Sequence, residues 1–160
     1  MKKILGLFLA MTLLIGCIPV HACAEEATYP KVTHSYVTAD DFASDEWSTD
    51  QRGAYLGNGR STIARADSTH INISGNTNAL QTCDKVRLTL YVERSTSYAT
   101  GYGTYKSYSY SVDNAYQLGK EIANIKVDRG YYYRVFAVHS VTENGVTETT
   151  DSVTNPIDYR

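Results

Sequence analysis

Residues 131–146 read YYYRVFAVHSVTENGV, and this stretch decides the fold class. Apolar side chains alternate along its first part, with Phe136 and Val138 on one face and, on the other face, Tyr131, Tyr133, Val135 and Ala137. This alternation is typical of a β-strand, and apolar residues on both faces predict a central strand that is covered on both sides. Asn144-Gly145 then predicts a tight hairpin turn, because both residues tolerate positive φ angles.

Shorter alternating runs precede this hairpin. The clearest has Val86, Leu88, Leu90 and Val92 on one face, and the others lie at 69–74, 106–112 and 121–127. Turn-forming residues fall between or beside the runs, at Ser74-Gly75-Asn76, Asp113-Asn114, Arg129-Gly130 and Asn155-Pro156. Strands at this spacing, with no long helical stretch between them, predict an all-β fold. We expect an antiparallel β-sandwich of about six or seven strands rather than an α/β fold.

The N-terminus has the three parts of a secretory signal peptide. Lys2 and Lys3 precede an apolar run from 4 to 20, and Ala22-Cys23-Ala24 follows as a small-x-small cleavage site. We therefore expect cleavage after Ala24, export from the cell, and no membrane-spanning segment in the mature chain. An alternative interpretation is a lipobox at Leu14-Ile15-Gly16-Cys17, in which the thiol of Cys17 would receive a lipid anchor.

An acidic segment follows the signal. Residues 25–51 carry seven acidic side chains against Lys31 alone. Such a polar segment cannot bury enough apolar surface to offset its chain entropy, so we expect a flexible spacer in which Trp47 docks on the flank of the folded domain. The predicted organisation is a signal peptide at 1–24, a spacer at 25–51 and a β-sandwich domain at 52–160.

Residues 127–139 resemble the penultimate strand of fibronectin type III modules, in which a turn with glycine leads into Tyr-x-aromatic-x-Val-x-Ala. The resemblance continues through Gly145–Glu148. It implies a fibronectin-III-like or immunoglobulin-like sandwich and places Tyr131 at the tyrosine corner, where its hydroxyl would bond a backbone group just upstream. The tryptophan that such sandwiches often bury in an early strand is absent, because Trp47 lies too far upstream.

A longer resemblance is to an uncharacterised family of small secreted proteins of Gram-positive bacteria. Its motifs match this chain in order at Arg52–Leu56, Gly59–Ile63, Gly75–Thr77, Asp84–Val86, and Gly130–Val135 with His139. The resemblance implies export and a sandwich fold. It transfers no catalytic residue.

The charge balance argues against a nucleic-acid partner. The chain has 15 Lys and Arg against 17 Asp and Glu, a net charge of −2, so it lacks the basic excess that would neutralise a run of phosphates. Gly101-Tyr102-Gly103 is not followed by the Lys-Ser/Thr pair of a phosphate-binding loop. We therefore expect no nucleotide and no other cofactor.

Motifs for catalysis or metal binding are also missing from the sequence. The histidines expected in the mature chain, His34, His70 and His139, are far apart and lack metal-ligand spacing, and no Gly-x-Ser-x-Gly elbow presents a serine. We expect no metal site and no enzyme. His139 is predicted to lie near the edge of the sandwich with a solvent or backbone partner, and Cys83 to be a small buried hydrophobic residue.

Five tyrosines among Ser, Thr and Gly make the strongest candidate contact surface: Tyr98, Tyr102, Tyr105, Tyr108 and Tyr110. Antibody binding loops use this composition, because tyrosine offers a large amphipathic surface at low rotamer cost. We expect Tyr108 and Tyr110 to take core positions. The predicted binding residues are therefore Tyr98, Tyr102 and Tyr105.

Together these features predict a secreted, monomeric, non-enzymatic module that binds an unidentified ligand at or outside the cell envelope. Two alternatives remain open. One is a secreted effector, such as an antibacterial protein, and the other is a hydrolase whose carboxylates come from distant parts of the chain.

Overall fold

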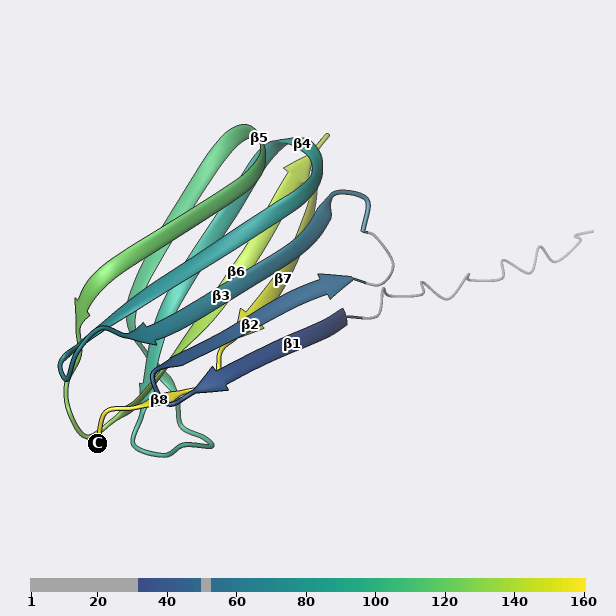
Figure 1. Ribbon diagram of the computed structural model, residues 1–160. Helices are drawn as coiled ribbons and strands as arrows, with labels where there is room; N and C mark the ends of the chain where they lie inside the picture. The colour runs from purple at the N-terminus through teal and green to yellow at the C-terminus, as the bar shows by residue number, and fades with distance from the viewer. Residues whose placement is uncertain (1–31, 50–52) are drawn as a thin grey trace, which may run out of the picture.

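The structure is a computed structural model that describes residues 32–49 and 53–160 (Figure 1). These residues form eight strands: β1 (Val32–Ala39), β2 (Phe42–Thr49), β3 (Leu56–Arg65), β4 (His70–Ser95), β5 (Gly103–Lys126), β6 (Tyr132–Glu143), β7 (Val146–Val153) and β8 (Ile157–Asp158). Every strand pair is antiparallel, which confirms the predicted fold class. Within the two described ranges there is no helix, and so none that is long and apolar enough to cross a membrane.

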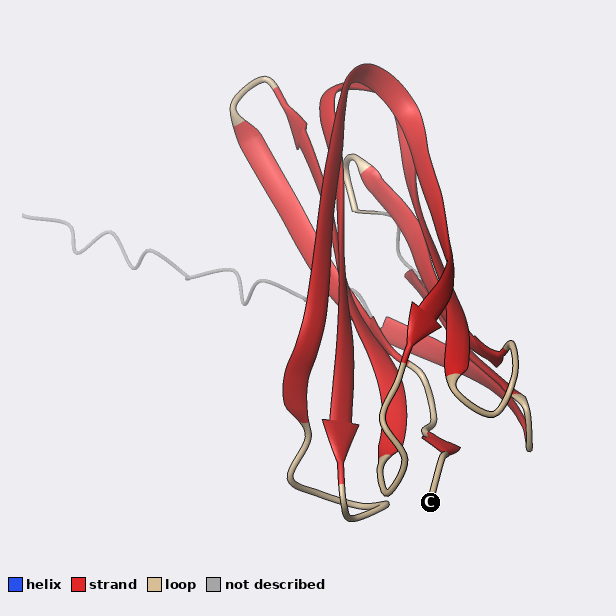
Figure 2. Ribbon diagram, turned by 90° about the vertical axis from the view of Figure 1, so that its left-hand side faces the viewer, coloured by secondary structure: helices blue, strands red, loops and turns tan. Residues whose placement is uncertain are grey.

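The sheet folds back on itself into two layers, because β4 and β5 each run through both. The first half of β4 pairs with β3 and its second half with β6, while β5 follows β4 along most of its length. A register shift between Asn78 and Cys83 and a positive φ of 50° at Asn114 mark the bend of this long hairpin. Figure 2 shows the long strands curving over at one end, so that the sheet curls as a half-barrel consistent with a β-sandwich.

Two of the predicted turns are wrong, because the chain passes through them without reversing. Asp113-Asn114 lies inside β5, at the bend. Ser74-Gly75-Asn76 lies in the regular first half of β4, where a Cβ atom on Gly75 would come within 2.7 Å of the Leu90 side chain. Glycine at this position therefore permits the two layers to approach each other. The four short predicted strands at 69–74, 86–92, 106–112 and 121–127 belong to only two long ones.

Residues 131–146 form β6, the hairpin turn and the start of β7, as predicted. Asn144 and Gly145 have φ angles of 50° and 78°, as a tight hairpin turn requires, and β6 lies between β4 and β7. Its outer face differs from the prediction of cover on both sides, because Phe136 and Val138 are only half-buried. The described residues place no further layer on that side, and Phe136 packs against Tyr91 of the neighbouring strand, with ring centroids 5.7 Å apart.

The core fills the space between the two layers. Most of the side chains predicted to face inward are buried, among them Ile71, Ile73, Val86, Leu88, Leu90, Val92, Val135 and Ala137. Each fully buried aliphatic side chain of this size stabilises the fold by roughly 1.5–3 kcal/mol. Cys83 is buried as predicted. Tyr108 and Tyr110 pack against this core from β5 while remaining half-buried.

The prediction of a flexible spacer at 25–51 is wrong for residues 32–49, which form β1 and β2. Strand β2 pairs with β3 in a regular register, and Ala43 and Trp47 enter the core. Asp45, one of the acidic residues of the predicted spacer, is fully buried and accepts a hydrogen bond from the backbone N–H of Val153 at 2.7 Å. A buried carboxylate with such a partner belongs inside a sheet, so acidity alone misled the prediction.

The predicted signal peptide at 1–24, its cleavage site after Ala24 and the alternative lipid site at Cys17 lie outside the described residues.

Candidate functional site

The loop between β4 and β5 holds Tyr98 at one end of the sandwich. Ser95 fixes the base of this loop, because its Oγ donates to the carbonyl of Thr100 at 2.6 Å and accepts from the backbone N–H of Ser97 at 3.0 Å. Gly101 takes a φ of +76°, which lets the chain turn back into β5. The loop is therefore held by its own hydrogen bonds.

Tyr98 is the exposed member of the three predicted binding tyrosines. Its side chain is 55% exposed. It meets Tyr132, from the start of β6, edge to face at a centroid distance of 5.4 Å and an angle of 84°. An aromatic ring that is anchored on one side and open on the other is suited to contact a ligand.

Tyr102 supports this loop from below. Its hydroxyl donates to the carbonyl of Tyr98 at 2.9 Å, and the guanidinium of Arg134 lies 4.0 Å from its ring centroid. Burial raises the pKa of the Tyr102 phenol. One face of the ring is thus already occupied by a cation.

Tyr105 likewise faces the protein. It packs edge to face on Tyr133 at 5.8 Å, and the guanidinium of Arg94 lies 4.5 Å from its ring centroid. The structure therefore does not bring Tyr98, Tyr102 and Tyr105 onto one contact surface. Tyr98 faces outward, whereas the other two hold the loop and strand in place.

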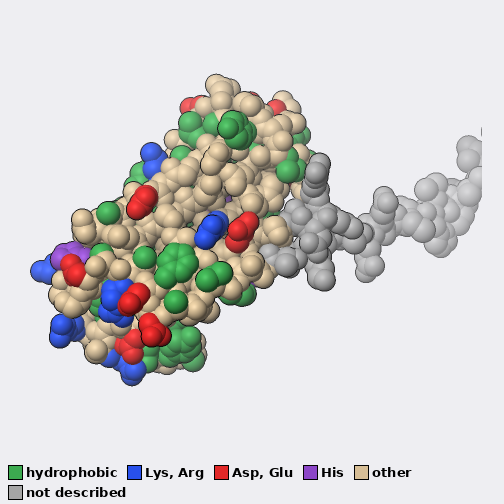
Figure 3. Space-filling model, in the orientation of Figure 1, with side chains coloured by type: hydrophobic (Ala, Val, Ile, Leu, Met, Phe, Trp, Pro, Cys, Tyr) green, Lys and Arg blue, Asp and Glu red, His purple; other side chains and the backbone are tan. Residues whose placement is uncertain are grey.

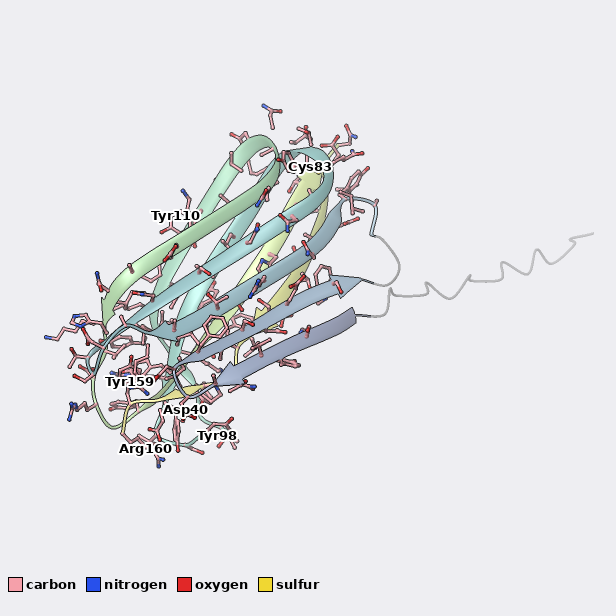
Figure 4. All side chains as sticks on the ribbon, viewed as in Figure 1. Asp40, Cys83, Tyr98, Tyr110, Tyr159 and Arg160 are labelled. Atoms are coloured by element: carbon pink, nitrogen blue, oxygen red, sulfur yellow. The ribbon has the colours of Figure 1, made fainter. Side chains whose placement is uncertain are left out.

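A groove with a volume of about 470 Å³ opens beside Tyr98, which is within the usual size range of ligand sites. Five separate segments of the chain line it: Thr38 and Ala39 at the end of β1 with Asp40 of the following turn, Arg65, Tyr98, Tyr132, and Pro156 with Asp158 near the C-terminus. In Figure 4, Asp40, Tyr98 and Arg160 gather at one end of the molecule, and Cys83 lies at the other. We call this hollow the Tyr98 groove.

Charges beside the Tyr98 groove largely compensate one another. Arg65 pairs with Asp41 and also donates to the carbonyl of Asp158, while Arg160 pairs with the Asp158 carboxylate at 2.9 Å. Hydrogen bonds from Arg160 hold the pKa of the Asp158 carboxyl below its ordinary value. Figure 3 shows side chains of both signs interspersed at this end. The groove therefore has fixed polar groups without a strong field of one sign.

A second hollow, of about 390 Å³, lies over β2, β3 and the first half of β4. Its side-chain hydroxyls are already used, because Thr62 and Ser74 bond each other at 2.6 Å. Phe42 is the one aromatic residue that lines it. The Tyr98 groove is the stronger candidate, since it combines an exposed aromatic ring with polar groups from several loops.

The hydroxyl bond to the upstream backbone that was predicted for Tyr131 is made by Tyr133 instead. The Tyr133 hydroxyl accepts from the backbone N–H of Asp128 at 2.9 Å and donates to the carbonyl of the same residue at 3.0 Å. Tyr133 points into the core and its hydroxyl reaches the turn that precedes β6. Tyr131, two residues earlier, is half-buried beneath the guanidinium of Arg94 at 4.5 Å.

His139 lies in the interior between the layers, so its predicted place at the sandwich edge is wrong. Its ring has no exposed surface, with Nδ1 at 2.9 Å from the Thr77 hydroxyl and Nε2 at 2.9 Å from that of Ser152. The Ser152 hydroxyl donates in turn to Ser61 at 2.8 Å. Burial lowers the pKa of the imidazole from 6.5 to about 4. This chain of hydrogen bonds links the two layers and is closed to solutes.

Most residues of the Tyr98 groove have no local sequence signal. Arg65, Tyr132 and Asp158 belong to segments that are distant in the chain, and their convergence depends on the strand order. The β-branched and aromatic content of 32–38 is a signal that would have predicted β1 and its turn. Among the described residues, no cluster of three or more His, Cys, Asp or Glu side chains could hold a metal ion.

The model of a family of unknown function, DUF6147, matches residues 21–157. A comparison with curated proteins gives no match.

Proposed function

The chain belongs to the DUF6147 family, whose description assigns no function, and from its structure we propose an exported, non-enzymatic binding module. In this proposal the protein is secreted by a Gram-positive bacterium and acts as a monomer at or outside the cell envelope. The Tyr98 groove is its contact site.

One observation carries the proposal: an exposed aromatic ring stands at the rim of a groove that five loop and strand ends build together. Binding sites concentrate on loops that a rigid scaffold positions, and the sandwich is such a scaffold. The hydrogen bonds of Ser95 and Tyr102 keep the Tyr98 loop in one conformation, so little entropy is lost on binding.

The relationship to fibronectin type III modules is part of the same proposal. Its support is the Tyr133 hydroxyl, which ties the entry of β6 to the backbone of Asp128 as a tyrosine corner does. The two strands that run through both layers are a difference from that fold.

Sedimentation with intact cells and isolated cell walls tests the proposal. The wild-type chain, purified from the medium of a secreting host, is compared with Tyr98→Ala and with Tyr116→Ala. Tyr116 is a matched control because it is 62% exposed and adjoins Ala115, the strand partner of Cys83, at the opposite end of the sandwich.

We expect the wild type and Tyr116→Ala to sediment with the walls, and Tyr98→Ala to bind at least about tenfold more weakly. No sedimentation of the wild type would overturn the proposal and favour a diffusible effector. Equal binding by all three proteins would contradict the part of the proposal that makes the Tyr98 groove the contact site.

A further inference from the structure

We propose that the Tyr98 groove binds a neutral, hydroxyl-rich saccharide chain. This inference rests on the proposed binding function and names its ligand class. Three features of the groove carry it: the distribution of charge, the availability of aromatic faces, and the chemistry of the polar groups.

The charge distribution argues against a polyanion. Arg65, the arginine in the groove lining, pairs with Asp41, the nearby Arg160 pairs with the lining residue Asp158, and Asp40 adds a further carboxylate to the lining. A teichoic-acid-like or other phosphate polymer would need arginine or lysine side chains that are free to meet it. A neutral ligand does not need free cationic side chains, and the carboxylates do not repel it.

The aromatic rings at this end of the sandwich differ in whether a face is open to a ligand. Arginine side chains lie over the rings of Tyr102, Tyr132 and Tyr159, at 4.0, 4.3 and 4.2 Å from the ring centroids. The exposed ring of Tyr98 is therefore the aromatic surface that the groove offers to a ligand. The C–H face of a sugar ring is apolar and matches the face of an aromatic ring, and the ring's hydroxyl edge stays hydrated.

The remaining polar groups suit hydroxyl partners. Asp40 offers carboxylate oxygens as acceptors, and the Thr38 hydroxyl, which already accepts from the side-chain amide of Asn155, retains its own proton to donate. A sugar hydroxyl both donates and accepts, so it can bond both groups at once. The lining has Ala39 and Pro156 as its aliphatic members, so it lacks the apolar pockets that anchor peptide side chains.

Competition during wall sedimentation tests the inference. The probes are soluble β-linked oligomers of N-acetylglucosamine and of glucose, with polygalacturonate as a polyanion of similar build. The proteins are the wild type, Tyr98→Ala, Asp40→Asn and Tyr116→Ala. Asp40→Asn removes the charge while the amide retains hydrogen-bonding atoms.

We expect at least one neutral oligomer to displace the wild type from walls, with an affinity that changes less than about twofold between low and high salt. Tyr98→Ala should weaken oligomer binding at least about tenfold, and Tyr116→Ala should not change it. Asp40→Asn should keep binding within about threefold, because a neutral ligand needs the hydrogen bond and not the charge.

Two results would overturn the inference, and they differ from failure of the proposed function. Displacement by polygalacturonate, with an affinity that falls steeply as the salt concentration rises, would show that the ligand is a polyanion. Sedimentation that depends on Tyr98 but resists every neutral oligomer would leave the binding function standing without this ligand class. Absence of wall sedimentation would contradict both the proposed binding function and the saccharide as its ligand.

Discussion

The buried imidazole of His139 should make the stability of the fold depend on pH. Burial lowers its pKa from 6.5 to about 4, and hydroxyl groups are its hydrogen-bond partners at both nitrogens. Above pH 6.5 the imidazole is neutral in the folded and unfolded chain alike. As the pH falls from 6.5 towards 4, the unfolded chain binds a proton that the folded chain does not, so protons favour unfolding.

The magnitude follows from the difference between the two pKa values. Within that window each pH unit lowers the free energy of unfolding by at most about 1.4 kcal/mol. From pH 7 to pH 5 the loss amounts to about 2 kcal/mol. With a urea m value of roughly 1–3 kcal/mol/M for a small domain, the unfolding midpoint should move down by about 1 M.

Urea unfolding at pH 7, 6 and 5, followed by the fluorescence of the buried Trp47, measures this loss. The variant His139→Gln should lose most of the pH dependence, whereas His70→Gln, which alters an imidazole that is 33% exposed, should retain it. The same loss of stability in all three proteins would refute the reasoning. Should His139→Gln fail to fold, an NMR titration of the wild-type His139 ring decides the matter, because a midpoint near 6.5 contradicts burial.

Three further outcomes are expected. Gly59→Ala places a Cβ atom 2.4 Å from the buried imidazole and should cost about 1–3 kcal/mol in chemical denaturation, whereas Gly103→Ala, with open space around it, should cost far less. Tyr133→Phe removes both hydrogen bonds to the backbone of Asp128 and should lower the free energy of unfolding by about 1–3 kcal/mol. An equal loss in Tyr131→Phe would contradict the assignment of this role to Tyr133. A chain that begins at residue 52 lacks β1 and β2 and should lose the cooperative thermal transition of the full chain, because the exposed edge of β3 can aggregate.

Alternation in the sequence predicted local faces well. Val86, Leu88, Leu90 and Val92 are all buried on one side of β4, and Asn144-Gly145 turns the chain as its chemistry requires. These successes share a cause, since period-two burial and positive φ depend on residues that are neighbours in the chain. The same reasoning could not predict that two short runs belong to one continuous strand. Gly75 is a residue typical of turns, but it lies inside β4 where the strand packs against the opposite layer.

The candidate site was predicted only in part. Tyr98 was predicted as a binding residue, and its exposed side chain lines the groove. The residues that line the groove with it, such as Asp40, Arg65 and Asp158, come from distant segments of the chain. Tyr102 and Tyr105 have the same local composition as Tyr98. The arginines that cover their rings, Arg134 and Arg94, come from other strands, and no local pattern reveals them.

Local patterns in the sequence were enough to predict the all-β class, most of the inward faces of the strands and the hairpin before β7, because each depends on periodicity or turn chemistry within a few residues. Long-range contacts, by contrast, place residues 32–49 in the sheet, where the buried Asp45 carboxylate has the N–H of Val153 and the imidazole of His34 as partners. They also give Tyr133 the hydroxyl bond to the upstream backbone and place His139 between the layers. Partners separated by many residues meet only when the sheet has closed, and burial then fixes the role of each side chain.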